Sequence, residues 1–285
     1  MRNSPQSFRQ FWILFKKNKA AVIGFCIISF FILVAIFADL IVPYDVAITQ
    51  DKTARLMAPS LEHLFGTDHL GRDVFARIVH GARTSLAMGA VSTIISLFIG
   101  GVLGIIAGYF GGLIDSIITR IMDILMCIPS ILLCLCIITV LGANTFNLLL
   151  AITISSVPGF TRILRATVLS MSSQEYIDAA KTAGSTHFRI MRRHILPNAI
   201  GMVIVQATMS ISSMIIFASG LSFIGLGVQP PVPEWGSMLS DSQNFMREYP
   251  YLLIFPGSAI ALTSVSLNLF GDGLRDVLDP RSNIN

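Results

Sequence analysis

Long apolar stretches separated by short polar segments dominate the pattern of this 285-residue chain. The apolar runs begin near residues 20, 85, 113, 144, 199 and 251. Most of them approach the ~20 apolar residues that an α-helix needs to cross a bilayer. The pattern therefore predicts an all-α polytopic membrane protein with six transmembrane helices.

These runs divide the chain into expected segments. Residues 1–19 predict a cytoplasmic amphipathic N-terminus, because Phe8, Phe11, Trp12 and Phe15 recur at helical spacing among basic residues. The first span is expected at 20–42 and is followed by an external loop at 43–83. A core with the other five spans covers 84–271 and contains a cytoplasmic loop at 161–198. A cytoplasmic tail is expected at 272–285.

Proline, glycine and tryptophan residues predict irregular places within this plan. Pro129 should kink the third span, and Pro158-Gly159 should end the fourth. The glycines within 222–228 favour a broken or re-entrant segment after the fifth span. In the polar loop that follows, Trp235 is expected at the membrane interface.

Small and charged residues also predict contacts at the helices. Gly100, Gly104 and Gly108 recur every four residues, so one face of the second span should let another helix approach closely. Arg120 and Asp123 are three residues apart on the third span and are expected to pair.

The polar segment from Glu175 to Asn198 predicts two short helices outside the membrane. Ser172 and Glu175 have the spacing of a capping box, and Gly184 should end the first helix. Ser185 should cap the second helix, and Pro197 should stop or redirect it. The second helix would place its apolar and basic residues on different sides: Phe188, Ile190 and Met191 on one, Arg189, Arg192 and Arg193 on the other.

Composition and charge support a membrane protein and set its orientation. Only 13% of residues are charged and the mean hydropathy is +0.73. Lys and Arg number five in 1–19 and six in 161–198, whereas 229–250 holds only Arg247. The five basic residues of 43–83 are balanced by five acids. This bias places both termini and the 161–198 loop in the cytoplasm and gives no indication of nucleic-acid binding.

The polar residues offer no catalytic or metal site of their own. The four cysteines lie inside apolar spans, so no disulfide framework is predicted. His63, His69 and His80 lie near Asp68 and Asp73, but no metal-ligand spacing repeats there. We interpret these histidines as solvated loop residues rather than metal ligands.

A family resemblance rests on the polar segment. Asp178-Ala179-Ala180, then Gly184, then Leu196-Pro197 resemble the "EAA" loop of ABC importer permeases, with Asp178 in place of the usual Glu and His194 in place of the usual Ile. Both departures are typical of the peptide/nickel branch, which residues 66–73 and 271–281 also resemble. By that resemblance, the residues that couple to an ATPase are Glu175, Tyr176, Asp178, Ala179, Ala180, Gly184, His194, Leu196 and Pro197.

The resemblance implies a function and a set of partners. The chain would be the second permease of a pair in the bacterial inner membrane, working with a homologous permease, two ATP-binding subunits, an external substrate-binding protein and membrane lipid. It would import dipeptides or oligopeptides; nickel or a metallophore is the alternative substrate. The chain lacks a Walker phosphate-binding motif, so ATP and magnesium would be held by the partners and the chain would not be an enzyme.

A secondary transporter or channel is the more remote alternative. Such carriers often contain internal repeats and buried acids along their path, and the sequence shows neither clearly. Co-purification of ATPase subunits would separate the two interpretations.

Overall fold

The structure is a computed structural model that describes the backbone of residues 8–278 and the side chains from residue 12 onward. The first part of the predicted N-terminal segment, 1–7, and the end of the predicted tail, 279–285, lie outside the described residues.

Helices make up nearly all of the described chain, and within residues 8–278 the β structure is limited to one isolated bridge between Thr67 and Asp73. Short 3₁₀ turns cover Lys52–Ala54 and Gln243–Phe245, and a π turn covers Met191–Ile195. The α-helices are α1 (Phe8–Lys17), α2 (Lys19–Ile36), α3 (Ala38–Ile41), α4 (Tyr44–Ile48), α5 (Val74–Phe110), α6 (Gly112–Met126), α7 (Ser130–Leu141), α8 (Thr145–Ser172), α9 (Glu175–Thr182), α10 (His187–Ile190), α11 (Leu196–Phe223), α12 (Trp235–Asp241) and α13 (Tyr251–Leu278).

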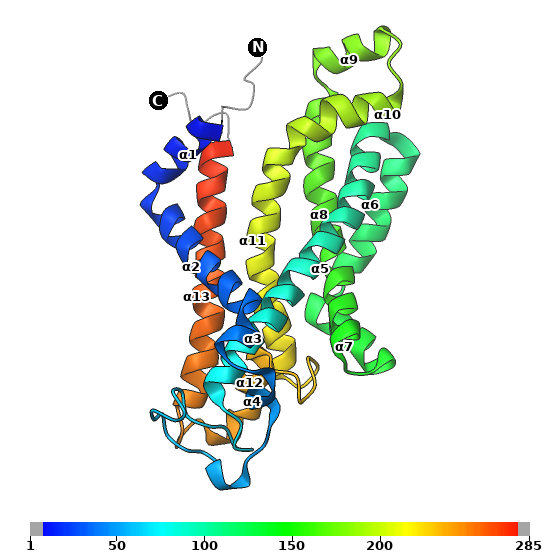
Figure 1. Cartoon of the computed structure of the whole chain (residues 1–285). Coiled ribbons are helices and arrows are strands. Elements are labelled where there is room, and N and C mark those ends of the chain that lie inside the picture. The colour runs from blue at the N-terminus through cyan, green and yellow to red at the C-terminus, as the bar shows by residue number, and fades with distance from the viewer. Residues whose placement is uncertain (1–7, 279–285) are drawn as a thin grey trace.

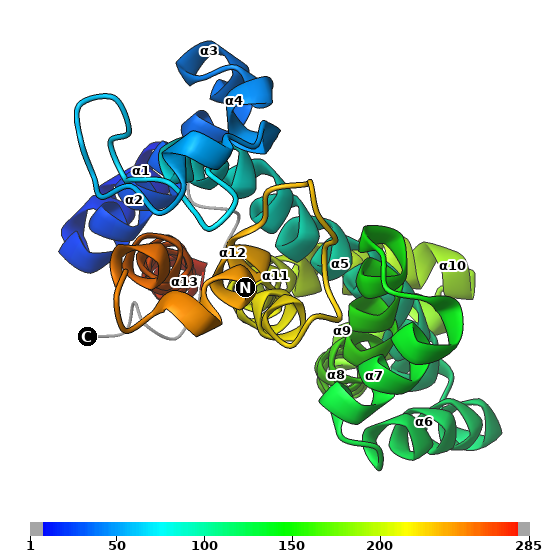
Figure 2. The same cartoon turned by 90° about the horizontal axis from the view of Figure 1, so that it is seen from below.

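The long helices run between two ends of the molecule (Figure 1). One end carries α1, the last turn of α13, and the short helices α9 and α10; we call it the inner end. The opposite end carries α3, α4, α12 and the loops around them, and we call it the outer end. Seen from the outer end, α6 lies at one edge of the molecule, far from α1 and α2 (Figure 2).

Five helical stretches within the described chain are long and apolar enough to cross a membrane, and the bent pair α6–α7 makes a sixth if it counts as one span. This agrees with the predicted all-α fold. The fourth span differs from the prediction, because α8 continues through Pro158 to Ser172. Pro158 removes one backbone hydrogen bond, but close packing against α5 keeps the helix intact on both sides.

The third span is interrupted more strongly than a kink. Helices α6 and α7 meet at an angle of 83° across the break that ends at Pro129. The predicted Arg120–Asp123 pair does not form; Asp123 instead accepts from Arg162 of α8 at 2.7 Å. A second pair joins the same two helices, since Arg165 Nη2 donates to Asp115 at 2.6 Å. Ion pairs therefore fix α6 against α8.

At the outer end, one prediction is narrowed and another is wrong. The segment after the fifth span is broken and not re-entrant, because α11 ends at Phe223 and the chain turns at Gly225, whose φ is +84°. Trp235 is fully buried instead of interfacial. Its indole N–H donates to the Ile78 carbonyl at 3.1 Å, and its ring packs edge-on against Phe31. Helix α12 is thus folded back against α5 and α2.

The N-terminal helix α1 packs against the spans. Phe15 is buried, with its ring 5.9 Å from that of Phe270 on α13 and 6.3 Å from that of Phe25 on α2. Asn18 donates to Asp276 at 3.0 Å, near the end of α13. The beginning and the end of the described chain are therefore joined at the inner end.

Candidate coupling site

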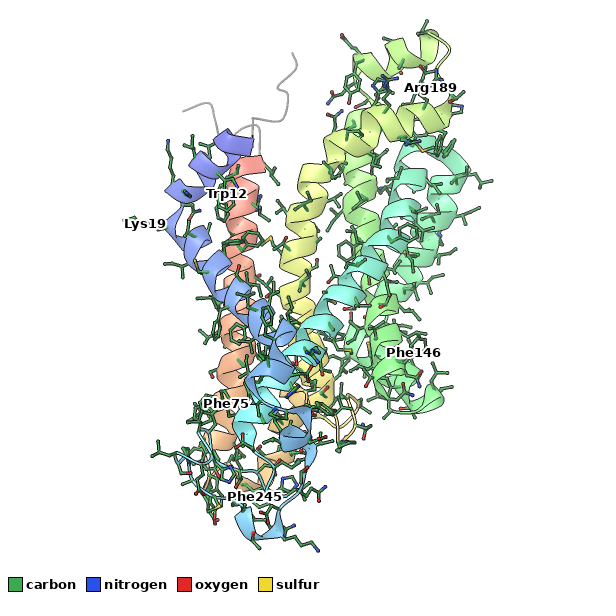
Figure 3. All side chains as sticks on the ribbon, in the orientation of Figure 1. Trp12, Lys19, Phe75, Phe146, Arg189 and Phe245 are labelled. Carbon is green, nitrogen blue, oxygen red and sulfur yellow. The ribbon has the colours of Figure 1, made fainter. Side chains whose placement is uncertain are left out.

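We call residues 175–195, which comprise α9, α10 and the π turn, the coupling helices. Most predicted coupling residues lie on α9, on the π turn or in the turn between α9 and α10, whereas Leu196 and Pro197 begin α11. The coupling helices stand at the inner end, where α8 leads into α9 and α10 leads into α11 (Figure 1). Arg189 is found on this end in the side-chain view, whereas Phe245 marks the opposite end (Figure 3).

The first coupling helix does not begin with the predicted capping box. Ser172 is the last residue of α8, and the N-cap of α9 is Gln174, whose side chain makes no capping hydrogen bond. Because Ser172 is still part of α8, its backbone is helical and does not adopt the extended conformation of an N-cap residue. Its hydroxyl is buried without a hydrogen-bond partner among the described residues.

Gly184 ends the first coupling helix by a defined pair of hydrogen bonds. Its φ is +75°, a region that residues with a Cβ rarely adopt. The Gly184 N–H donates to the Lys181 carbonyl at 2.9 Å, and the Ser185 N–H donates to the Ala180 carbonyl at 3.1 Å. This is a Schellman motif, so the turn between the two coupling helices is strongly determined by glycine.

The second coupling helix begins one residue later than predicted and does not stop at Pro197. Thr186, not Ser185, is the N-cap, and its hydroxyl accepts from the Arg189 N–H at 3.4 Å. Pro197 lies in the first turn of α11, where a missing N–H is tolerated. The π turn before it, closed by the Leu196 N–H donating to the Met191 carbonyl, keeps α10 and α11 continuous.

A small apolar cluster holds the coupling helices onto the spans. Val168 of α8 is buried together with Ile177, Ile190 and Ile195, and Ala180 packs against them. Tyr109, near the end of α5, lies within hydrogen-bond distance of His187, with its hydroxyl 2.9 Å from Nδ1. Movement of these helices therefore has a direct packing route into α5 and α8.

Burial separates the predicted coupling residues into two groups. Ala180 and His194 are half-buried and lie toward the molecule. The others are exposed on the surface of the inner end: Glu175, Tyr176, Asp178, Ala179, Gly184, Leu196 and Pro197. The interpretation of Ala180 as a docking residue therefore has a competing explanation in its contact with the cluster around Ile177.

Phe188 is the functional candidate that sequence reasoning missed. The sequence analysis placed it on one side with Ile190, but Ile190 is fully buried whereas Phe188 is 69% exposed. Two residues apart on a helix, the side chains point about 200° apart, and this spacing could have revealed the difference. Phe188 thus stands on the exposed surface of the coupling helices.

The glycine face of α5 lies directly against α8. A Cβ added at Gly104 would be 2.6 Å from the Thr161 carbonyl oxygen, and one at Gly100 would be 2.6 Å from that of Val157. At Gly108 the corresponding distance to the Arg165 carbonyl is 2.8 Å. The two helices therefore approach backbone to backbone over more than two turns, up to the base of the coupling helices.

A buried ion network closes the outer end, and it too was missed in the sequence. Arg72 is 1% exposed and donates to Asp68 at 2.6 Å and to Asp241 at 2.8 Å. Arg77, 2% exposed, lies 3.5 Å from Asp241. The network thus combines a pair within the 43–83 loop, Arg72 with Asp68, with contacts to Asp241 at the end of α12.

The outer histidines take part in the packing and are not all solvated. His80 is buried, with Nε2 2.8 Å from the Val42 carbonyl, which corrects the interpretation of it as a solvated loop residue. His63 lies 2.8 Å from Asp73, and the His69 ring stacks on Phe245. Within residues 8–278 no group of three or more His, Cys, Asp or Glu side chains is arranged to hold a metal ion.

Glu234 joins three helices at the outer end. Its carboxylate accepts from the Gly236 and Ser237 N–H groups at 2.8 and 2.7 Å, which caps α12. It also accepts from Ser85 of α5 at 3.3 Å and Ser219 of α11 at 3.4 Å. Burial raises the pKa of the Glu234 carboxyl above its usual value despite these donors.

Comparison with known proteins identifies the family. Residues 100–284 match the family described as "Binding-protein-dependent transport system inner membrane component". The chain belongs to this family of ABC importer permeases. Residues 7–59 match a second family, described as "N-terminal TM domain of oligopeptide transport permease C". The chain is therefore a transport subunit of the membrane and not an ATP-hydrolysing enzyme.

Individual relatives agree with this assignment. The chain is 48% identical to the "Dipeptide transport system permease protein DppC" of Alkalihalophilus pseudofirmus, over 93% of this chain and 87% of that protein. It is 42% identical to the "Glutathione transport system permease protein GsiD" of Escherichia coli, over 96% of this chain and 90% of that protein. The resemblance to the second permease of the peptide/nickel branch is thereby confirmed.

A solved structure shares the fold. A chain of the MetNI methionine ABC transporter in an inward-facing conformation superimposes with a TM-score of 0.60, covering 71% of this chain and 97% of that one. At 20% sequence identity, this likeness concerns the arrangement of helices alone.

Proposed function

We propose that this permease imports dipeptides or other short peptides, and that its coupling helices dock on an ATP-binding subunit. A homologous permease completes the path, a substrate-binding protein delivers the peptide from outside, and ATP with magnesium is held by two ATP-binding partners. The names of the relatives that transport dipeptides and glutathione support the substrate class. Nickel or a metallophore is the alternative, and no cluster of metal-binding side chains in residues 8–278 favours it.

The observation that carries the docking proposal is the surface of the coupling helices. Tyr176 and Phe188 of the coupling helices are 39% and 69% exposed, and Leu196, the first residue of α11, is 44% exposed beside them at the inner end. Ala179 and Gly184 leave room beside them. Exposed apolar side chains in a polar segment indicate a protein interaction site. Because the same helices pack on α5 and α8 through Ile177 and Ile190, motion of the partner is transmitted as a rigid body.

The docking test uses an exposed position. In the tagged permease complex, Ala179→Asp should reduce recovery of the ATP-binding subunits by about tenfold, because a charge would be buried at the interface. Ala58→Asp, an exposed alanine of the outer loop, is the matched control and should retain them. Full recovery and transport in Ala179→Asp would contradict docking at this surface.

The orientation also belongs to the proposal. Both termini and the coupling helices should face the cytoplasm, as the Lys and Arg distribution predicts. In intact cells lacking other reactive cysteines in the chain, Ser60→Cys should react with an impermeant thiol reagent and Thr182→Cys should not. Both residues are exposed, so a difference between them reports the side of the membrane. Labelling of position 182 alone would reverse the orientation.

A further inference from the structure

A cavity of about 330 Å³ lies between α8, α11 and the break that separates α6 from α7. Its walls come from the break between α6 and α7, from the stretch of α8 around Pro158 and Gly159, and from the middle of α11. The volume is in the range of small-molecule sites. Pro129 and Pro158 are both part of its lining.

The polar part of the cavity is formed by uncharged groups. Ser155 and Ser156 of α8 line it together with Gln206 and Ser210 of α11 and Ser130 at the start of α7. None of the described residues that line the cavity is an acid, a base or a histidine. The rest of the wall is apolar, with Phe160 and Met214 among it.

The hydrogen bonds of these side chains show what they can offer a ligand. Ser155 and Ser156 both donate to the Ile152 carbonyl, at 2.9 and 2.7 Å, so each hydroxyl retains acceptor lone pairs. Gln206 donates one N–H to Ser210 at 3.3 Å, which leaves its carbonyl oxygen and a second N–H. The cavity therefore presents both acceptors and donors without charge.

These features match a peptide backbone. Each peptide group supplies one N–H donor and one carbonyl acceptor and carries no charge. A transport path must bind its cargo strongly enough to admit it and weakly enough to release it. A charged side chain in the wall would retain peptides of opposite charge and exclude those of like charge. An uncharged wall that includes the Gln206 amide does neither.

We propose that this cavity is a subsite of the translocation path that binds the peptide backbone, and that Gln206 determines its indifference to the charge of the cargo. This rests on the proposed function in peptide import. Ser155 and Ser156 complete the subsite as acceptors for peptide N–H groups. A chain with a fixed charge at Gln206 should therefore discriminate between peptides by charge.

The test introduces the charge after assembly. In the full transporter, with the four natural cysteines of this chain replaced by alanine, Gln206→Cys is treated with a sulfonate or a trimethylammonium thiol reagent. Import into proteoliposomes is then measured for tripeptides of net charge −1, 0 and +1. The sulfonate should lower import of the anionic peptide relative to the cationic one by about tenfold, and the trimethylammonium group should reverse the ratio.

Controls separate this proposal from the function on which it rests. Gln229→Cys, exposed at the outer end and outside the cavity, receives the same reagents and should leave the ratio unchanged. The subsite would be overturned if neither reagent at Gln206→Cys changed the ratio of anionic to cationic peptide import. It would also be overturned if the reagents could not reach position 206 because another subunit or lipid fills the cavity. A transporter that imports no peptide before any modification would instead overturn peptide import itself.

Discussion

The two ends of this permease are built on different principles. At the outer end, Arg72 and Arg77 are buried against Asp68 and Asp241, and Trp235 is enclosed by apolar side chains. At the inner end, a cluster of four buried aliphatic side chains joins the coupling helices to α8, while Phe188 and other apolar groups are exposed. The outer end pairs its buried carboxylates with arginines of the same chain, whereas the inner end exposes apolar side chains on the coupling helices.

The difference predicts where the chain would depend on a partner. Buried charges at the outer end are paired within the chain, so their loss should reduce the stability of the permease itself. Exposed apolar groups at the inner end contribute little to that stability and should matter for assembly. Substitutions at the outer end should thus lower stability and leave partner binding unchanged. Substitutions at the inner end should lower partner binding and leave stability unchanged.

The largest loss of stability is expected at the ion network. Arg72→Met keeps an unbranched stem like that of arginine but removes the guanidinium, which leaves Asp68 and Asp241 without their main cation. Removing one partner of a buried ion pair costs about 3–5 kcal/mol. Thermal unfolding of the purified permease should show a markedly lower midpoint than Arg55→Met, an exposed arginine of the same loop. Equal midpoints would show that the outer end does not depend on these pairs.

A smaller but clear loss is expected between the two ends, on the glycine face. Gly104→Leu would place a side chain within 2.6 Å of the α8 backbone and force α5 and α8 apart. Overpacking of this kind typically costs about 1–3 kcal/mol. Gly101→Leu is the matched control, because a Cβ there meets nothing within 4 Å. The amount of assembled transporter recovered should fall for Gly104→Leu alone; similar yields would contradict the close approach.

The sequence predicted the fold well because the signals were local and long. Runs of apolar residues specified the spans, and the spacing of Gly100, Gly104 and Gly108 indicated a packing face. Pro158 was misjudged because its effect depends on the neighbouring helix α5, which no local pattern reveals. The same holds for Trp235, since a polar loop can be folded back into the protein.

The candidate site was predicted only in outline. Gly184 was recognised because a positive φ has a strong residue preference. The caps at Gln174 and Thr186 differ from the prediction by small shifts, since several polar residues there could serve. Ala179 faces outward and Ala180 faces inward. The sequence could not show this, because it depends on how the first coupling helix packs on Val168.

A pH-dependent effect of moderate size is expected from Glu234. Because burial raises its folded-state pKa, the stabilising contribution of the neutral form is complete below the unfolded-state value of about 4.3. It is lost as pH rises through the raised folded-state pKa. Glu234→Gln remains neutral throughout. The unfolding midpoint of the wild-type protein relative to Glu234→Gln should therefore fall as pH rises from about 4.3 toward the raised folded-state pKa. A difference that does not change with pH would show that folding does not raise the pKa of this carboxyl.

The smallest effect on stability, and the sharpest test of the comparison, is expected at Phe188. Its side chain is 69% exposed, so Phe188→Ala should change the free energy of unfolding of the permease by less than about 0.5 kcal/mol. Aromatic side chains at the centre of an interface often contribute 2 kcal/mol or more, which corresponds to roughly thirtyfold weaker binding. We therefore expect Phe188→Ala to retain its unfolding midpoint and to lose ATP-binding subunits in a pull-down. Leu64→Ala, 53% exposed on the outer loop, should retain both. If Phe188→Ala lowers the midpoint and keeps its partners, the inner end is a self-contained structure like the outer end, and the contrast between them is wrong.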